Sequence, residues 1–243
     1  MLDAPGAIPV ASLINGHTHC NHWNEGENMS VDIEAGRAPT TYGEDGVAHP
    51  AFHHVNLKTT RLDDMIAWYG QVAGLWANFR SPEVAFLTND GANHRVALIA
   101  FPGISDDPDK ISHTGLHHTA FEFPTLADLL TRYQTLKAVG IRPHLCVDHG
   151  LTTSFYYEDP DGNSVELQVD NFGDWAASTE WIRTAPEFVA DPVGPFIDPD
   201  ALVRAHADGH DAAEIHRRAY AGEYPPSAPP DLRLPQPPTE GAR

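Results

Sequence analysis

The chain has 243 residues, of which 41% are hydrophobic, and its formal net charge is −19. This length is enough to bury a substantial core, and the hydrophobic content is ordinary for a soluble globular protein. So large an acidic excess argues against binding to a nucleic-acid backbone or to an anionic membrane surface, because both would repel it.

The cysteine count and the hydropathy pattern favour the cytoplasm. Cys20 and Cys146 are the two cysteines of the sequence, too few for a disulfide framework, and they fit a reducing compartment. The first residues lack a basic region followed by a long apolar run, so we expect no signal peptide. No stretch approaches the roughly 18 consecutive apolar residues that would span a membrane.

Residues 1–50 predict an irregular N-terminal arm, because no long periodic segment appears there. The arm contains the motif GHTHCNH, with His17, His19, Cys20 and His22 close together. Nitrogen and sulfur ligands suit zinc, but this spacing matches no established zinc pattern and no second ligand pair follows. We therefore interpret the motif as a polar loop or a subunit contact.

Residues 51–103 predict one β-α-β-β-β module. Residues 52–59 alternate like a strand, and residues 61–73 carry apolar side chains at the i, i+3, i+4 and i+7 positions of a helix. Gly74 is a typical helix stop. Strand-like runs follow at 75–79, 83–88 and 94–101, separated by Ser-Pro and by Asn-Asp-Gly.

Residues 115–172 predict a second module of the same order after a polar linker at 104–114. Its elements are a strand at 116–123, an amphipathic helix at 126–139 and strands at 142–147, 151–157 and 164–169. The modules form an internal repeat: His53, His54, Leu62, Asp64 and Tyr69 recur 64 positions later as His117, His118, Leu126, Asp128 and Tyr133. Identities at one constant offset rarely arise by chance, so the repeat is a specific signal.

The last two strands of the second module predict a β-hairpin in the stretch SFYYEDPDGNSVELQ, residues 154–168. Its centre, DPDGN, combines proline, glycine and side chains that bond their own backbone, which is a strong turn signal. In the second strand, Val165 and Leu167 share one face and Glu166 lies on the other. The hairpin thus places a single acidic side chain in the middle of a strand.

Residues 173–243 stop repeating and predict a C-terminal extension. Short helices are expected at 175–184, 199–207 and 212–220, followed by a proline-rich tail at 224–238. Both terminal extensions are long for a minimal module. We therefore expect them to cover the pocket or to mediate oligomerisation. We expect a homo-oligomer.

Superposing the modules brings four positions around one point. The first strands supply His54 and His118, and the last strands supply Ala97 and Glu166. Two histidines and one carboxylate on one face form the arrangement that binds mononuclear non-haem Fe(II). A lone histidine on an apolar strand is more often a core residue, but the symmetric pair beside a carboxylate favours a metal site.

Each ligand histidine has a histidine neighbour. Successive side chains of a strand point to opposite faces, so one member of each His-His pair faces the common point. We assign His54 and His118 to the metal and interpret His53 and His117 as outer-face or supporting residues.

These residues resemble the vicinal oxygen chelate superfamily, which is built from paired β-α-β-β-β modules. The matching motifs are HVNLKT at His54, HTAFEF at His118 and SFYYEDPDGNSVEL around Glu166, within residues 50–172. The chain is most similar to the type I extradiol ring-cleaving dioxygenases. The resemblance implies an α+β fold in which both modules form one open, cup-shaped β-sheet around a metal, with the terminal extensions packed outside.

The resemblance also implies a reaction. It predicts cleavage of a catechol-like aromatic diol by O₂ at Fe(II), with Mn(II) as the alternative ion, bound by His54, His118 and Glu166. His94 matches a histidine that lies beside bound oxygen in the family. Tyr156, ten positions before Glu166, matches a tyrosine that bonds the substrate oxygen.

The acid/base residue is less well defined by the resemblance. His149 resembles a loop histidine that moves protons, but the family motif places that histidine nine positions before the tyrosine, and here the gap is seven. His144 is therefore kept as the alternative.

Two other functions fit the same fold. One is an isomerase or lyase of the glyoxalase type that uses a divalent ion as a Lewis acid. Ala97 argues against it, because a fourth protein ligand is expected at that position. The other is a metal-free protein that binds a small molecule, against which the intact set of His54, His118 and Glu166 argues.

Overall fold

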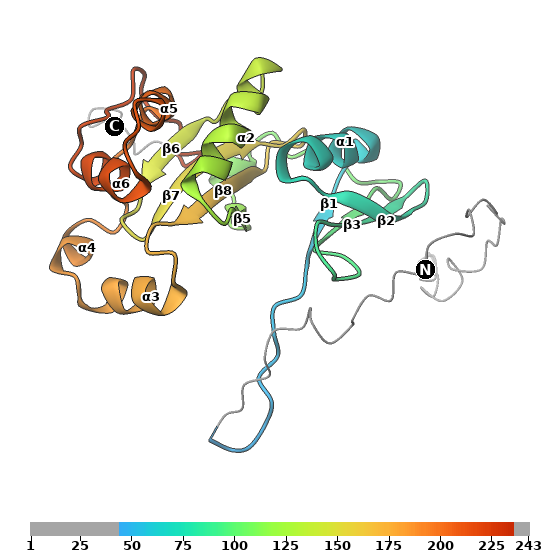
Figure 1. Cartoon of the computed structure of the whole chain (residues 1–243). Helices are drawn as coiled ribbons and strands as arrows, with labels where there is room; N and C mark the ends of the chain where they lie inside the picture. Colours follow the sequence, from blue (N-terminus) through green and yellow to red (C-terminus); the bar gives the residue numbers. More distant parts are fainter. Residues whose placement is uncertain (1–43, 236–243) are drawn as a thin grey trace, which may run out of the picture. The chain divides into compact units, whose positions relative to one another are not determined.

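The computed structural model describes residues 44–235 (Figure 1). The motif GHTHCNH and most of the predicted N-terminal arm lie outside the described residues, as do residues 236–243. Within the described range, no helix is long and apolar enough to cross a membrane.

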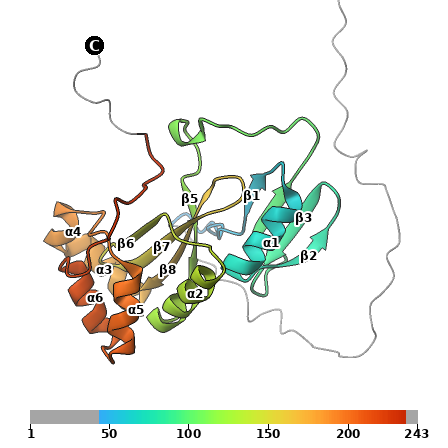
Figure 2. The same ribbon diagram turned by 90° about the horizontal axis from the view of Figure 1, so that it is seen from above.

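Two modules of the same order make up the centre of the fold (Figures 1 and 2). The first contains β1 (Val55–Lys58), α1 (Leu62–Ala73), β2 (Trp76–Arg80), β3 (Val84–Thr88) and β4 (Val96–Ile99). The second contains β5 (His118–Glu122), α2 (Leu126–Ala138), β6 (Leu145–Asp148), β7 (Thr152–Glu158) and β8 (Ser164–Asp170). The predicted α+β class with paired β-α-β-β-β modules is confirmed.

The strand ladders run within each module, as two four-stranded sheets in the orders β1-β4-β3-β2 and β5-β8-β7-β6. In each sheet the first and last strands of the module pair in parallel, and the other neighbours pair antiparallel. The register places Ala97 beside Asn56 in the first sheet and Glu166 beside Ala120 in the second. Ala97 and Glu166 therefore occupy the same position of the repeat.

Both module helices bury the apolar stripe expected from their periodicity. In α1 the buried side chains are Leu62, Met65, Tyr69 and Val72, and in α2 they are Leu126, Leu129, Leu130, Tyr133 and Leu136. Thr125 caps α2, because its side chain accepts a hydrogen bond from the amide of Asp128. Gly74, with a φ of 69°, ends α1 in the left-handed conformation that favours glycine.

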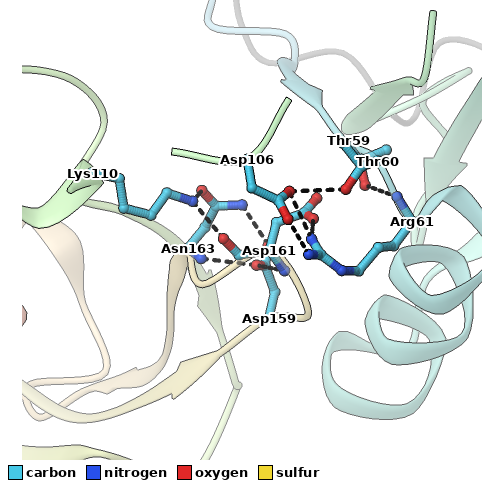
Figure 3. Close-up of polar contacts among 8 residues, drawn as sticks. All are labelled: Thr59, Thr60, Arg61, Asp106, Lys110, Asp159, Asp161 and Asn163. Carbon is cyan, nitrogen blue, oxygen red and sulfur yellow. Dashed lines mark hydrogen bonds and ion pairs between the residues drawn. The ribbon is translucent and has the colours of Figure 1, made fainter. Parts of the chain in front are cut away.

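The turn between β7 and β8 is where the second module contacts both the first module and the linker (Figure 3). Arg61, at the start of α1, forms ion pairs with Asp161 of the turn and with Asp106 of the linker. Lys110 donates to the carbonyl of Asp161 at 2.6 Å and to the side chain of Asn163 at 2.9 Å. The predicted hairpin is thus fixed at its tip by two cations from outside it.

The C-terminal extension contains α3 (Trp175–Thr184), α4 (Pro186–Ala190), α5 (Pro199–Ala207) and α6 (Ala212–Tyr220). The sequence predicted α3, α5 and α6, whereas α4 is too short to produce a recognisable apolar period. Leu202 and Ala205 of α5 and Ile215 and Ala219 of α6 are buried in the core cluster of the second module. Burial of apolar side chains therefore fixes this part of the extension to the second module.

Tyr69 provides a test of the contact between the modules. Its buried hydroxyl donates to the carboxylate of Asp159 at 3.2 Å. Replacing Tyr69 with Phe should lower the free energy of unfolding by about 1–3 kcal/mol, because a buried carboxylate loses one of its donors. Urea denaturation measures the change.

Tyr157→Phe is the matched control for this prediction. The hydroxyl of Tyr157 is also buried, but it has no hydrogen-bond partner within the described residues. Its removal should leave the free energy of unfolding unchanged or raise it. Equal losses in the two variants would show that the Tyr69–Asp159 hydrogen bond adds no stability.

Candidate functional site

Glu166 lies at the centre of the site. It is on β8, between β5 and β7, and its side chain is on the face opposite to the core residues Val165 and Leu167. Only 5% of Glu166 is exposed. The hydroxyl of Tyr156, its cross-strand neighbour on β7, donates to Oε1 at 3.0 Å, and Nε2 of His118 lies 3.2 Å from Oε2.

The environment of Glu166 keeps it ionised. Burial raises the pKa of this carboxyl group, but hydrogen bonds from His118, Ser154 and Tyr156 outweigh burial, so its pKa lies below the usual value. Tyr156 behaves in the opposite way: burial and the charge of Glu166 raise the pKa of its hydroxyl. The site therefore pairs a carboxylate with a tyrosine that retains its proton at neutral pH.

The hydrogen bonds of His117 fix the ring of His118. Nε2 of His117 donates to the carbonyl of Leu232 at 3.1 Å, so the Nδ1 of a neutral His117 accepts from Nδ1 of His118 at 2.8 Å. In a neutral His118 this leaves the lone pair on Nε2 facing the carboxylate of Glu166, whereas in the protonated ring Nε2 donates to that carboxylate. Either a proton on Nε2 or a metal ion therefore bridges the two atoms.

A divalent ion suits this gap. Metal–nitrogen and metal–oxygen bonds of about 2.1 Å at a right angle separate the two ligand atoms by about 3 Å. A histidine that donates its other nitrogen to a neighbouring group is the usual form of a metal-binding histidine. His118 and Glu166 therefore have the spacing of two ligands of one ion, and His117, predicted as an outer-face or supporting residue, forms a hydrogen bond with His118.

His149 lies in the turn between β6 and β7, on the other side of Tyr156. Its Nδ1 donates to the carbonyl of Val193 at 2.6 Å, and its Nε2 lies 2.9 Å from the hydroxyl of Tyr156. The carbonyl only accepts, so in the neutral ring Nδ1 carries the proton and Nε2 is an acceptor. The single proton of Tyr156 is thus shared between two acceptors, His149 and Glu166.

His144, the alternative acid/base residue, has other contacts. Its Nδ1 donates to the carbonyl of Asp231 at 2.7 Å, and its Nε2 lies 3.0 Å from the hydroxyl of Ser164. Burial lowers the pKa of its ring. Both nitrogens are therefore used in holding the C-terminal tail and β8, whereas His149 contacts the hydroxyl of Tyr156.

A second group of histidines precedes β1 and β4. Ligand atoms of His53, His54 and His94 all lie within 4.8 Å of one another. The ring of His94 stacks on Phe86, with centroids 4.7 Å apart, and lies 4.3 Å from the ring of His54. Burial, followed by repulsion from His54 and His53, lowers the pKa of His94, which favours the neutral ring.

The structure therefore arranges the predicted site residues in two groups. The contacts of His118, Glu166, Tyr156 and His149 form one continuous chain. The contacts of His54 are with His53 and His94. The set of three ligands that includes His54 stays a prediction.

Two backbone carbonyls that bind histidines of the site, those of Val193 and Leu232, were not predicted from the sequence. The carbonyl of Val193 binds His149, and a backbone carbonyl has no signature in a sequence. His117 was assigned to the outer face or to a supporting role without a partner, and its partner, the carbonyl of Leu232, comes from the C-terminal tail.

Comparison with known proteins adds the following findings. Residues 51–167 match the family model of the Glyoxalase/Bleomycin resistance protein/Dioxygenase superfamily. The chain is 44% identical over 173 residues to biphenyl-2,3-diol 1,2-dioxygenase 3 of Rhodococcus globerulus, covering 71% of this chain and 90% of that protein. It is 41% identical over 182 residues to biphenyl-2,3-diol 1,2-dioxygenase 2 of the same organism, covering 75% and 95%.

Solved structures also superpose on part of the chain. The lactoylglutathione lyase from Agrobacterium tumefaciens aligns with a TM-score of 0.40 and 23% identity, over 49% of this chain and 92% of that one.

Metal content tests the predicted ligands. Replacing Glu166 with Ala should abolish stoichiometric binding of a divalent ion and leave the protein folded, because it removes the acceptor opposite Nε2 of His118. His118→Ala and His54→Ala should behave alike. Elemental analysis of anaerobically purified protein loaded with Fe²⁺ measures occupancy, and thermal melting checks the fold.

The adjacent histidine is the control for this prediction. His53→Ala should keep full occupancy, since His53 lies outside the predicted ligand set. Loss of metal in His53→Ala and His94→Ala, together with full occupancy in His118→Ala and Glu166→Ala, would move the ion to the other group of histidines.

Proposed function

The chain belongs to the glyoxalase/bleomycin resistance protein/dioxygenase superfamily and, within it, to the extradiol ring-cleaving dioxygenases, and from this premise we propose that it cleaves a catechol-like diol with O₂ at one ferrous ion. The family resemblance deduced from the sequence is thereby confirmed. The observation that carries the proposal is the continuous contact chain from His149 through Tyr156 and Glu166 to His118.

The proposed ligands of iron are His54, His118 and Glu166. When bound, ferrous iron supplies Lewis acidity toward the diol oxygens and a redox partner for O₂. The orientation of His118 by His117 and the ionised state of Glu166 both support this assignment. Ala97, at the repeat position of Glu166, carries no fourth ligand, which supports ring cleavage over the glyoxalase-type alternative.

Tyr156 and His149 are proposed to handle the proton of the substrate. Tyr156 retains its proton, so it is a hydrogen-bond donor to a diol oxygen once that proton turns away from Glu166. His149 offers Nε2 as an acceptor 2.9 Å from the same hydroxyl. It takes a proton when the diol ionises and returns it to the ring-opened product.

The reaction balances without another reactant. One carbon–carbon bond of the ring breaks next to the diol, and both atoms of O₂ enter the product. No external reductant is consumed, and the proton taken by His149 is given back.

His94 is proposed to face the oxygen, and its lowered pKa favours a neutral ring there.

The relatives at 44% and 41% identity are named for biphenyl-2,3-diol, so this diol is the first substrate to test. Oxygen uptake by iron-loaded protein should be about one O₂ per diol, with a yellow ring-opened product. No uptake with biphenyl-2,3-diol or with any other catechol, together with turnover in a cofactor-independent isomerase assay, would replace this function by the glyoxalase-type alternative.

Variants of the proton pathway test the roles of Tyr156 and His149. Tyr156→Phe should keep iron and lower kcat by about one to three orders of magnitude, because it removes one donor and no ligand. His149→Ala should lower kcat similarly. His144→Ala, which loses contacts to Asp231 and Ser164, is the comparison. Normal kinetics in His149→Ala with a large loss in His144→Ala would reverse the assignment.

The variant Ala97→Glu tests the reaction class. Val96 and Leu98 face the core, so residue 97 lies on the other face of β4, as Glu166 does on β8. A carboxylate there should retain or tighten metal binding and suppress oxygen uptake, because it adds a ligand and negative charge where diol and O₂ must bind. Ala97→Gln, with similar volume and no charge, is the control. Undiminished oxygen uptake in Ala97→Glu would show that residue 97 is remote from the site.

A further inference from the structure

The ring of His149 is held by a segment of the C-terminal extension. β6 is the edge strand of its sheet, and residues 191–197 lie along its open side. The amide of Asp148 donates to the carbonyl of Pro195 at 3.0 Å, and the amide of Ile197 donates to the carbonyl of Cys146 at 3.0 Å. Val147 and Phe196 form an antiparallel bridge. The carbonyl of Val193 thereby reaches Nδ1 of His149.

Gly194 makes this close approach possible. Its φ is 78°, in the left-handed region that other residues rarely adopt. A Cβ atom at this position would lie 2.1 Å from the carbonyl oxygen of Asp148. Any side chain would therefore push the segment away from β6 and move the carbonyl of Val193 away from His149.

A second contact from the extension fixes the residue before His149. Asp148 is fully buried, and its Oδ1 accepts from the amide of Gly150 at 2.9 Å. Its Oδ2 lies 2.9 Å from Nδ1 of His216, on α6. A buried carboxylate without its donor is costly, so this contact holds the turn that carries His149.

We propose that residues 191–197 and His216 position His149 for proton transfer: the carbonyl of Val193 keeps the proton on Nδ1, and His216 holds the turn so that Nε2 faces Tyr156. This proposal rests on the proposed function, in which His149 moves the proton of the diol. It makes the C-terminal extension part of the active site of the two modules.

Three variants of the iron-loaded protein test the proposal by kinetics. His216→Leu removes the donor to Asp148, and Gly194→Ala displaces the segment. His216→Asn keeps a donor near the place of Nδ1 and should restore activity. In His216→Leu and Gly194→Ala we expect kcat for the diol to fall about ten- to a hundredfold with little change in KM, as small displacements of a reacting group cost this much.

Arg217→Gln is the matched control on α6. The Arg217 side chain is exposed and pairs with Glu214, so its replacement should leave kcat unchanged. Iron content and thermal melting are measured for all variants. If Gly194→Ala fails to fold, the comparison of kcat between His216→Leu and His216→Asn still tests the proposal.

The double variant with His149→Ala separates positioning from general stability. If His216 acts through His149, then His216→Leu should lower kcat no further in the His149→Ala background. An equal loss of kcat in both backgrounds would overturn the proposal. Wild-type kcat in His216→Leu would overturn it as well.

A readout independent of turnover distinguishes failure of this proposal from failure of the proposed function. Nitrogen NMR of Zn²⁺-loaded protein with labelled histidine reports the tautomer of His149, which is assigned from the signal missing in His149→Ala. We expect a protonated Nδ1 in the wild type and in His216→Asn, and a mixture of tautomers in Gly194→Ala, which moves the carbonyl of Val193 away. In His216→Leu we expect shifted signals of the His149 ring, because the turn that carries it moves. If the wild type opens no diol ring, unchanged His149 signals in both variants still reject the positioning role, and changed signals support it.

Discussion

A buried carboxylate on a central strand sets the constraint on which the site depends. Glu166 is almost fully enclosed, and a charge in that position is tolerated only with hydrogen-bond or cation partners. The β7–β8 register supplies Tyr156 directly opposite it, and β5 supplies His118. The hydroxyl of Tyr156 contacts both Glu166 and His149, so the group that donates to the carboxylate also connects it to His149.

The two modules share one architecture but differ in the residues at equivalent positions of the repeat. Both modules bury one helix against one sheet, and both have a histidine pair at or just before the start of the first strand. On the last strands, however, Glu166 corresponds to the buried Ala97. The second module therefore holds Glu166, Tyr156 and His149, and the first module holds the cluster of His53, His54 and His94.

The hairpin that carries Glu166 is fixed at both ends. At its tip, Arg61 and Lys110 bind the turn (Figure 3). The hydroxyl of Tyr69 also donates to the buried Asp159. At the other end, residues 191–197 and α6 enclose the β6–β7 turn that carries His149. Packing from both sides limits the freedom of Tyr156 and Glu166, which is what a preorganised site requires.

The sequence by itself determined the helices and strands of the two modules, the repeat and the equivalence of Ala97 and Glu166, because side-chain periodicity and turn residues are local properties. It also showed the family through the residues around His54, His118 and Glu166. The tertiary structure alone showed that the hydroxyl of Tyr156 contacts His149 and that the ring of His144 contacts Ser164, since both histidines precede Tyr156 in the same hairpin. It also brought the carbonyl of Val193 and the ring of His216 to the site from a segment that does not repeat. Such contacts join residues far apart in the chain, and no local pattern encodes them.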